Sequence, residues 1–170
     1  MKSYFITAVG CSLAVVALAG VPYVFSAEPP TTKTKTASSK TEPITSSLRG
    51  RVVWLSETLE RKYGVKEVPE AAERVLVLET ASGELHPLVE DIRGRGFRRD
   101  PRLRNIDVEL LVREHPGVAF VQVIRVFQLK DGAKYELDYW CEICSIAMFE
   151  LKECECCQAP IEFRSRKIDE

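Results

Sequence analysis

The chain has 170 residues, 45% of them hydrophobic and 29% charged, and its 24 Lys or Arg against 25 Asp or Glu give a formal net charge of −1. This balance provides no overall attraction to nucleic acid, which is therefore not an expected partner. The sequence contains no Gly-rich phosphate loop, no G-x-S-x-G and no H-E-x-x-H. We therefore identify no catalytic residues and expect a non-enzymatic protein.

The first 26 residues have the features of an export signal. Lys2 precedes an uncharged apolar run over residues 4–25, in the order that signal peptides show. We predict a signal peptide over residues 1–26 that is cleaved after Ser26. The run is also long enough to cross a bilayer core of about 30 Å, so an uncleaved membrane anchor is the alternative. Both readings predict a location in the periplasm or cell envelope, with membrane contact only through this segment.

A change in composition follows the apolar run. Residues 27–47 are rich in Thr, Ser, Pro and Lys and contain almost no apolar side chain. Such a stretch cannot bury enough surface to offset its conformational entropy, so we predict a disordered linker. From Leu48 onward, about 120 residues have the composition of a globular domain.

The globular part predicts a mainly β, antiparallel fold. A strand over residues 48–55 leads into a short helical segment over 56–64, with Ser56 as its N-cap and Gly64 at its end. The remaining expected elements are a polar excursion at 65–73, a hairpin of strands 74–80 and 85–89, an irregular or helical Arg-rich link at 91–104, a hairpin of strands 106–113 and 118–130, and strands at 134–140 and 160–164.

The order of a single strand, a hairpin, an irregular or helical link and a second hairpin resembles the OB-fold. Residues 48–55, 74–89 and 106–130 carry this resemblance, which implies a small antiparallel barrel over 48–133. A cysteine-rich ribbon over 134–170 would be attached to it. The combination also resembles small exported bacterial proteins of unknown function, a resemblance that implies no activity.

Five of the six cysteines lie between residues 140 and 157, in WCEICSIAMFELKECECC. Cys141 and Cys144 form one C-x-x-C pair, and Cys154 and Cys157 form a second. Each pair presents two sulfurs on one side of a tight turn, and two such turns facing each other supply a tetrahedral thiolate site. The pattern resembles a zinc ribbon with a short spacing between the pairs. We predict zinc on these four residues, a single iron as the alternative metal, and Cys156 as the alternative ligand.

Two other readings of the cysteines remain open. Disulfides could replace the metal in an exported protein, although five cysteines cannot all pair and a bond between the adjacent Cys156 and Cys157 would be strained. Cys141 and Cys144 could instead serve thiol–disulfide redox chemistry or metal handling, because the W-C-x-x-C motif resembles that of thioredoxins. Only 26 residues follow Cys144, too few for the rest of a thioredoxin fold.

A cluster of arginines is the remaining candidate site. Within twelve residues lie Arg93, Arg95, Arg98, Arg99, Arg102 and Arg104. Guanidinium groups suit phosphate and carboxylate partners, so this stretch predicts binding of an anionic ligand, a glycan or an oligonucleotide, or of an acidic envelope protein. The competing interpretation, which we favour, is a solvated segment whose arginines pair with neighbouring acidic residues.

Overall fold

The computed structural model describes residues 42–168. The predicted signal peptide or anchor at 1–26 and most of the predicted linker lie outside these residues. Within the described part of the chain, no helix combines the length and the apolar character needed to cross a membrane.

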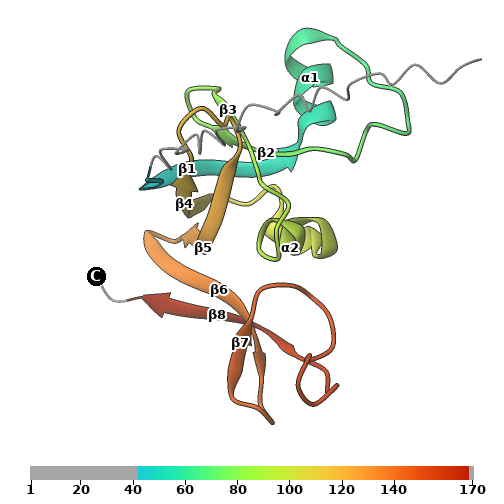
Figure 1. The fold of residues 1–170 in the computed structure, drawn as a ribbon. Helices are drawn as coiled ribbons and strands as arrows, with labels where there is room; N and C mark the ends of the chain where they lie inside the picture. The colour runs from blue at the N-terminus through green and yellow to red at the C-terminus, as the bar shows by residue number, and fades with distance from the viewer. Residues whose placement is uncertain (1–41, 169–170) are drawn as a thin grey trace, which may run out of the picture. The chain divides into compact units, whose positions relative to one another are not determined.

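The described residues form an antiparallel sheet of eight strands, which confirms the mainly β prediction (Figure 1). Its strands run in the order β3-β2-β1-β4-β5-β6-β7, and β8 pairs with β6. The strands are β1 (Ile44–Trp54), β2 (Leu76–Thr80), β3 (Leu85–Pro87), β4 (Val108–Glu114), β5 (Val121–Lys130), β6 (Ala133–Cys141), β7 (Ile146–Met148) and β8 (Glu162–Ile168). Three helical elements accompany them: α1 (Leu55–Tyr63), α2 (Gly94–Arg99) and the 3₁₀ helix η1 (Pro101–Leu103).

Strand β1 changes partner at Gly50. Residues 44–50 pair with β4, and residues 50–54 pair with β2. Strands β1 and β2 approach so closely at this position that a Cβ on Gly50 would lie 2.2 Å from the Glu79 carbonyl oxygen. The close approach of the two strands therefore requires glycine. At the other end of the sheet, Leu88 and Val121 form a single parallel bridge that brings the end of β3 beside β5.

The inner faces of these strands and the α2–η1 segment enclose the main core. Alternate residues of the strands face this core because successive side chains point to opposite faces. From α2 and η1, Phe97 and Leu103 add apolar side chains to this core. The main strand residues of the core are Val52, Trp54, Leu76, Leu78, Val108, Leu110, Val112, Val121 and Val123. We call residues 44–130, with these helices, the β1–β5 unit.

Two local predictions need correction. Strand β1 begins at Ile44, so residues 44–47 of the predicted linker are in fact strand. The polar side chains at 45–47 hid this assignment, because pairing with β4 needs only the backbone. Helix α1 begins at Leu55 after the N-cap Trp54, and the Ser56 hydroxyl donates to the Ala72 carbonyl instead of capping the helix. Gly64 ends the helix with φ 67° in the left-handed region, as predicted.

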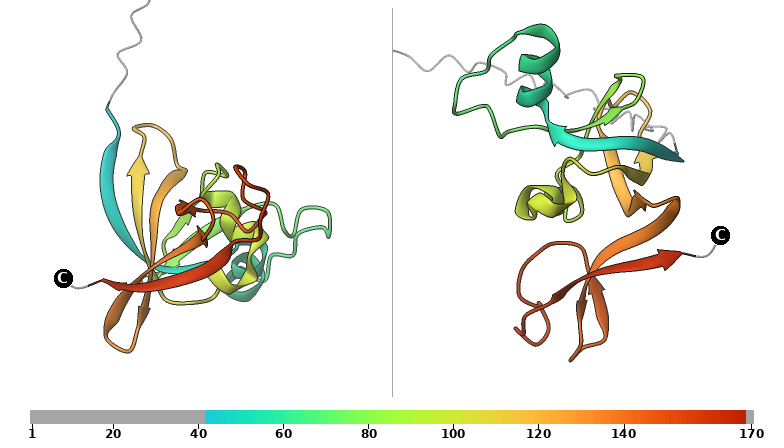
Figure 2. Two further views of the ribbon diagram at one scale, coloured as in Figure 1. Left: turned by 90° about the horizontal axis from the view of Figure 1, so that it is seen from below. Right: turned by 180° about the vertical axis from the view of Figure 1, so that it is seen from behind.

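The C-terminal strands form a second, smaller structure, which we call the ribbon (residues 134–168). Strand β6 is its centre, because residues 133–136 pair with β5, residues 139–141 pair with β7, and residues 134–140 pair with β8. Its apolar cluster consists mainly of Tyr139, Met148 and cysteines. Figure 1 and the right-hand view of Figure 2 show α2 between β1 and the loops of the ribbon.

Candidate metal centre

The structure brings the two C-x-x-C pairs together. Cys141 ends β6, and the chain turns through Cys144 into β7, while Cys154 and Cys157 form a second turn before β8. The four sulfur atoms all lie within 4.8 Å of one another, and the sulfurs of Cys141 and Cys157 are 3.5 Å apart. These four cysteines therefore form a group that could hold a metal ion.

Both turns close in the same way. The N–H of Ser145 donates to the Cys141 carbonyl at 2.8 Å, and the N–H of Gln158 donates to the Cys154 carbonyl at 2.9 Å. Ser145 and Gln158, each directly after its pair, have φ values of 53° and 59° in the left-handed region. Two separate segments thus adopt one backbone conformation, which fixes each pair of sulfurs on one side of its turn.

Backbone N–H groups support the first sulfur of each pair. The Cys144 N–H approaches the Cys141 sulfur at 3.5 Å, and the N–H groups of Cys156 and Cys157 donate to the Cys154 sulfur. Such bonds stabilise negative charge on sulfur and orient it toward a metal. They are the chief reason that the pKa of the Cys154 thiol is lowered to about 7.

The spacing of the sulfurs fits a tetrahedral metal site. Zn–S bonds of about 2.3 Å place the sulfurs of a tetrahedron about 3.8 Å apart, and the separations in this group surround that value. A disulfide needs about 2.0 Å, and no two of the five described cysteines lie at bonding distance. A set of four protein thiolates leaves no open position for a substrate, which is typical of structural metal sites.

Cys156 lies outside the group. Its side chain is exposed, and it occupies the third position of its motif, where the first motif has the exposed Ile143. The third position of both turns is therefore exposed, although the Cys156 thiol also neighbours that of Cys144. The four preferred ligands come together, and the alternative ligand does not join them.

The thiols of the first pair lie among the other thiols of the group. The neighbouring thiols of Cys157 and Cys156 raise the pKa of Cys144 above its usual range. The pKa of Cys141 is also raised, because burial and adjacent thiols outweigh the bond from the Cys144 N–H. Reactive C-x-x-C cysteines instead have a lowered thiol pKa.

Glu150 lies between the two metal-binding turns, and the sequence did not reveal that it is buried and paired. Glu150 is one of several acidic residues near the two C-x-x-C pairs, and such residues are expected to lie on the solvated face of a hairpin. In the structure only 3% of its side chain is exposed, and its carboxylate lies 2.7 Å from Arg95 and 3.3 Å from Lys152. Arg95 is 55 residues away, so no local pattern could have indicated this pair. Burial opposes ionisation, but the bonds from Arg95 and Lys152 lower the pKa of Glu150.

Four arginines of the 93–104 segment contact the ribbon. Arg95 and Arg99 pair with Glu150 at 2.7 and 3.4 Å. The Arg93 guanidinium lies 3.4 Å from the centre of the Phe149 ring, and Arg102 lies 4.5 Å from that of Phe163. Each of these charges thus has a partner on the ribbon.

The other two arginines contact the β1–β5 unit. Arg98 and Arg104 lie 4.9 and 5.1 Å from the Trp54 ring. Arg98 also pairs with Glu90, and Arg104 donates to the Phe97 carbonyl at 2.6 Å. All six arginines therefore have contacts within the protein, and binding of an anionic ligand by this segment stays a prediction.

A buried hydrogen-bonded group joins η1 to β6. The carboxylate of Asp100, which is 1% exposed, accepts bonds from Arg102 at 2.6 Å and from the Tyr139 hydroxyl at 2.6 Å. Burial opposes ionisation of Asp100, but these bonds hold its pKa below the usual value. The Arg-rich segment thus connects the ribbon to the β1–β5 unit by buried polar contacts.

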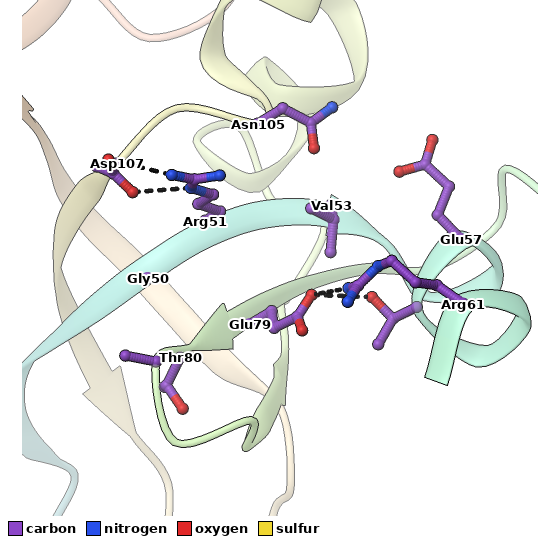
Figure 3. Close-up of a pocket in the computed structure, with 11 residues that line it drawn as sticks. Gly50, Arg51, Val53, Glu57, Arg61, Glu79, Thr80, Asn105 and Asp107 are labelled. Carbon is purple, nitrogen blue, oxygen red and sulfur yellow. Dashed lines mark hydrogen bonds and ion pairs between the residues drawn. The ribbon is translucent and has the colours of Figure 1, made fainter. Parts of the chain in front are cut away.

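A separate groove of about 570 Å³ lies between α1 and the outer face of β1 and β2 (Figure 3). Arg51 pairs with Asp107 at 2.8 Å, and Arg61 pairs with Glu79 at 2.5 Å. Because each cation has its own carboxylate, the groove has no excess positive charge for an anion. No sequence pattern indicates this groove, because its lining comes from three separate segments, 50–61, 79–81 and 105–107.

Comparison with known proteins assigns no family to this geometry. The chain shows no significant match to a protein-family model, a curated protein or a solved structure. Functional inference therefore rests on the chemistry of the site. Four convergent thiolates can bind Zn²⁺ or a single iron ion and fix two turns of the chain.

Proposed function

We propose that the protein is an exported, non-enzymatic binding or structural module whose ribbon is stabilised by zinc on Cys141, Cys144, Cys154 and Cys157. The observation that carries this proposal is the convergence of four sulfurs within 4.8 Å from two turns of the same conformation. The metal when bound would supply no chemistry beyond cross-linking these turns, because all four positions are taken by protein thiolates.

The composition of the ribbon supports a folding role for the metal. Two of the four buried residues in its apolar cluster are the ligands Cys141 and Cys154, and the other two are Tyr139 and Met148. Such a cluster is too small to offset the entropy of ordering the ribbon loops. Metal binding would supply the missing free energy, as it does in other small metal-dependent folds.

The proposal includes an OB-like barrel as the body of the protein. Three observations support it: the strand order β3-β2-β1-β4-β5, the parallel bridge between Leu88 and Val121, and the position of α2 between β3 and β4. Barrels of this type use the last bridge to close the sheet and a helix to plug one end. The ribbon would then be an addition to the barrel, continuous with it through β6.

Export is proposed from the N-terminal sequence. Lys2 and the apolar run at 4–25 favour a signal peptide or an anchor, and they place the protein in the periplasm or cell envelope. A zinc tetrathiolate would also keep these cysteines from forming disulfides in that oxidising environment.

The two alternative functions have less support. Redox catalysis at Cys141 and Cys144 would need lowered thiol pKa values, whereas both are raised. Anion binding by the arginines at 93–104 would need free guanidinium groups, whereas each has a partner in the protein. We therefore do not carry either forward as the main function.

Cobalt titration tests the proposal. Metal-free protein titrated with Co²⁺ under reducing conditions is expected to develop the intense absorption of a tetrahedral cobalt tetrathiolate, saturating at one equivalent. Added Zn²⁺ should abolish this absorption, because Zn²⁺ binds such sites more tightly than Co²⁺. Weak absorption of octahedral type, or absorption that does not saturate at one equivalent, would contradict a tetrathiolate site.

A further inference from the structure

The ribbon is attached to the β1–β5 unit by a contact that lies between the two metal-binding turns. Glu150 and Phe149 follow β7 and precede Cys154. The Glu150 carboxylate, 3% exposed, faces Arg95 and Arg99 of α2. A buried carboxylate is costly unless it is paired, so this position of the segment depends on α2.

The backbones of the two parts also meet closely. A Cβ on Gly96 would lie 2.5 Å from the Phe149 carbonyl oxygen, so α2 approaches the ribbon segment without an intervening side chain. On the same side, Arg93 covers the Phe149 ring at 3.4 Å. Contacts of this kind form only when the ribbon segment has one defined position.

The two sides of this contact are held in place by different means. On the α2 side, Phe97 and Leu103 are fully or almost fully buried in the main core, so α2 is fixed by the β1–β5 unit. On the ribbon side, the segment that contains Glu150 is held at its ends by Cys144 and Cys154. The first end is also held by the pairing of β7 with β6, whereas the turn at Cys154 lies outside the strands and would be held to the first end by the shared metal.

We propose that metal binding and docking of residues 149–153 on α2 are coupled through Glu150, so that the metal controls whether this segment of the ribbon is fixed against α2. This inference rests on the proposed metal site. With metal, the segment between the turns is ordered and Glu150 reaches Arg95. Without metal, the segment is free, the carboxylate gains more from water than from a buried position, and the segment leaves α2, while β6 stays paired with β5.

Coupling of this kind is reciprocal. If bound zinc favours docking of the segment on α2, then docking must increase the affinity of the site for zinc by the same factor. A substitution on α2, which supplies no ligand, should therefore weaken zinc binding. We expect Arg95→Gln and Glu150→Gln each to weaken zinc affinity by about 5- to 150-fold. The double variant should be no weaker than the weaker single variant, because both remove the same contact.

Zinc affinity would be measured on the reduced full chain by competition with a chromophoric chelator. Glu162→Gln is the matched control for the carboxylate, since Glu162 lies on β8 of the ribbon, is exposed and forms no ion pair among the described residues. Arg61→Gln is the control for the guanidinium, because Arg61 lies on α1 and is 58% exposed. Both controls should retain wild-type affinity to within about twofold.

Hydrogen exchange provides a readout that does not depend on affinity. Zinc should slow exchange of the amides at 149–152 in the wild type and do so less in Arg95→Gln, whose α2 amides remain protected by the core. Stoichiometric zinc binding with equal affinity in all variants would overturn the coupling and leave the metal site intact. Absence of stoichiometric zinc binding in the wild type would overturn the metal site and the coupling with it.

Discussion

Cys157→Ser is expected to abolish tight zinc binding and unfold the ribbon, whereas Cys156→Ser, one residue earlier, should change neither. Cys157 belongs to the group of four sulfurs, and its sulfur lies 3.5 Å from that of Cys141. Structural zinc contributes apparent binding free energies of about 10–16 kcal/mol in small zinc domains. Loss of one thiolate should therefore remove most of the stability of a ribbon with so small an apolar cluster.

The pair of variants provides its own control, since the two substitutions are chemically the same. Zinc content by elemental analysis, near-ultraviolet circular dichroism and the thermal midpoint would be compared in both. Trp140, next to Cys141, should report loss of the ribbon in the near-ultraviolet signal of Cys157→Ser. Equal zinc content in the two variants would show that Cys157 is not a ligand, and zinc loss only in Cys156→Ser would exchange their roles.

Gly50→Ala is the second substitution for which we expect a large effect. An added Cβ would lie 2.2 Å from the Glu79 carbonyl oxygen and 2.8 Å from its carbonyl carbon. Both atoms belong to the backbone of β2 and cannot move without loss of pairing with β1. We expect the free energy of unfolding to fall by about 2–4 kcal/mol, measured by urea denaturation.

Ser47→Ala is the matched control for Gly50→Ala. Ser47 lies on the same strand, is exposed, and pairs with β4 through its backbone, so its substitution should change the unfolding free energy by less than about 0.5 kcal/mol. Equal stability of the two variants would mean that β1 and β2 do not cross as closely as the structure places them. The assignment of Gly50 as the residue at which β1 changes partner from β4 to β2 would then be wrong.

Local patterns in the sequence were sufficient for most strands. Alternation of apolar and polar residues revealed β4 and β5, and the Gly64 end of α1 follows from the backbone conformation that glycine allows. The start of β1 was missed because residues 45–47 are polar, and pairing with β4 depends on backbone groups that every residue carries. Composition therefore misplaced the end of the linker by four residues.

The metal centre was foreseeable in part. The C-x-x-C spacing indicated four ligands, but C-E-C-C leaves two residues that could be the last ligand. The choice depends on the turn, because the residue at the third position is exposed in both motifs, Ile143 in the first and Cys156 in the second. No spacing rule for the cysteines alone contains that information.

The contacts of the arginines could not be assigned from the sequence. Six arginines in one short segment are compatible with a ligand site or with internal pairing, and only the fold decides between them. Their partners come from distant parts of the chain: Arg95 meets Glu150, Arg93 meets Phe149, and Arg98 meets Trp54. The cluster of arginines at 93–104 therefore indicated that this segment makes polar contacts. It did not indicate that the ribbon supplies many of the partners.

Native mass spectrometry of the protein recovered without reductant, combined with alkylation of accessible thiols, tests the central claim most directly. The account predicts one zinc ion per chain, with Cys156 alone alkylated among the five cysteines at 141–157 while the metal is bound. Removal of the zinc with a chelator should then make all five react. A metal-free mass that is lower by the hydrogens of one or two disulfides would contradict the metal site and establish a disulfide-bonded ribbon.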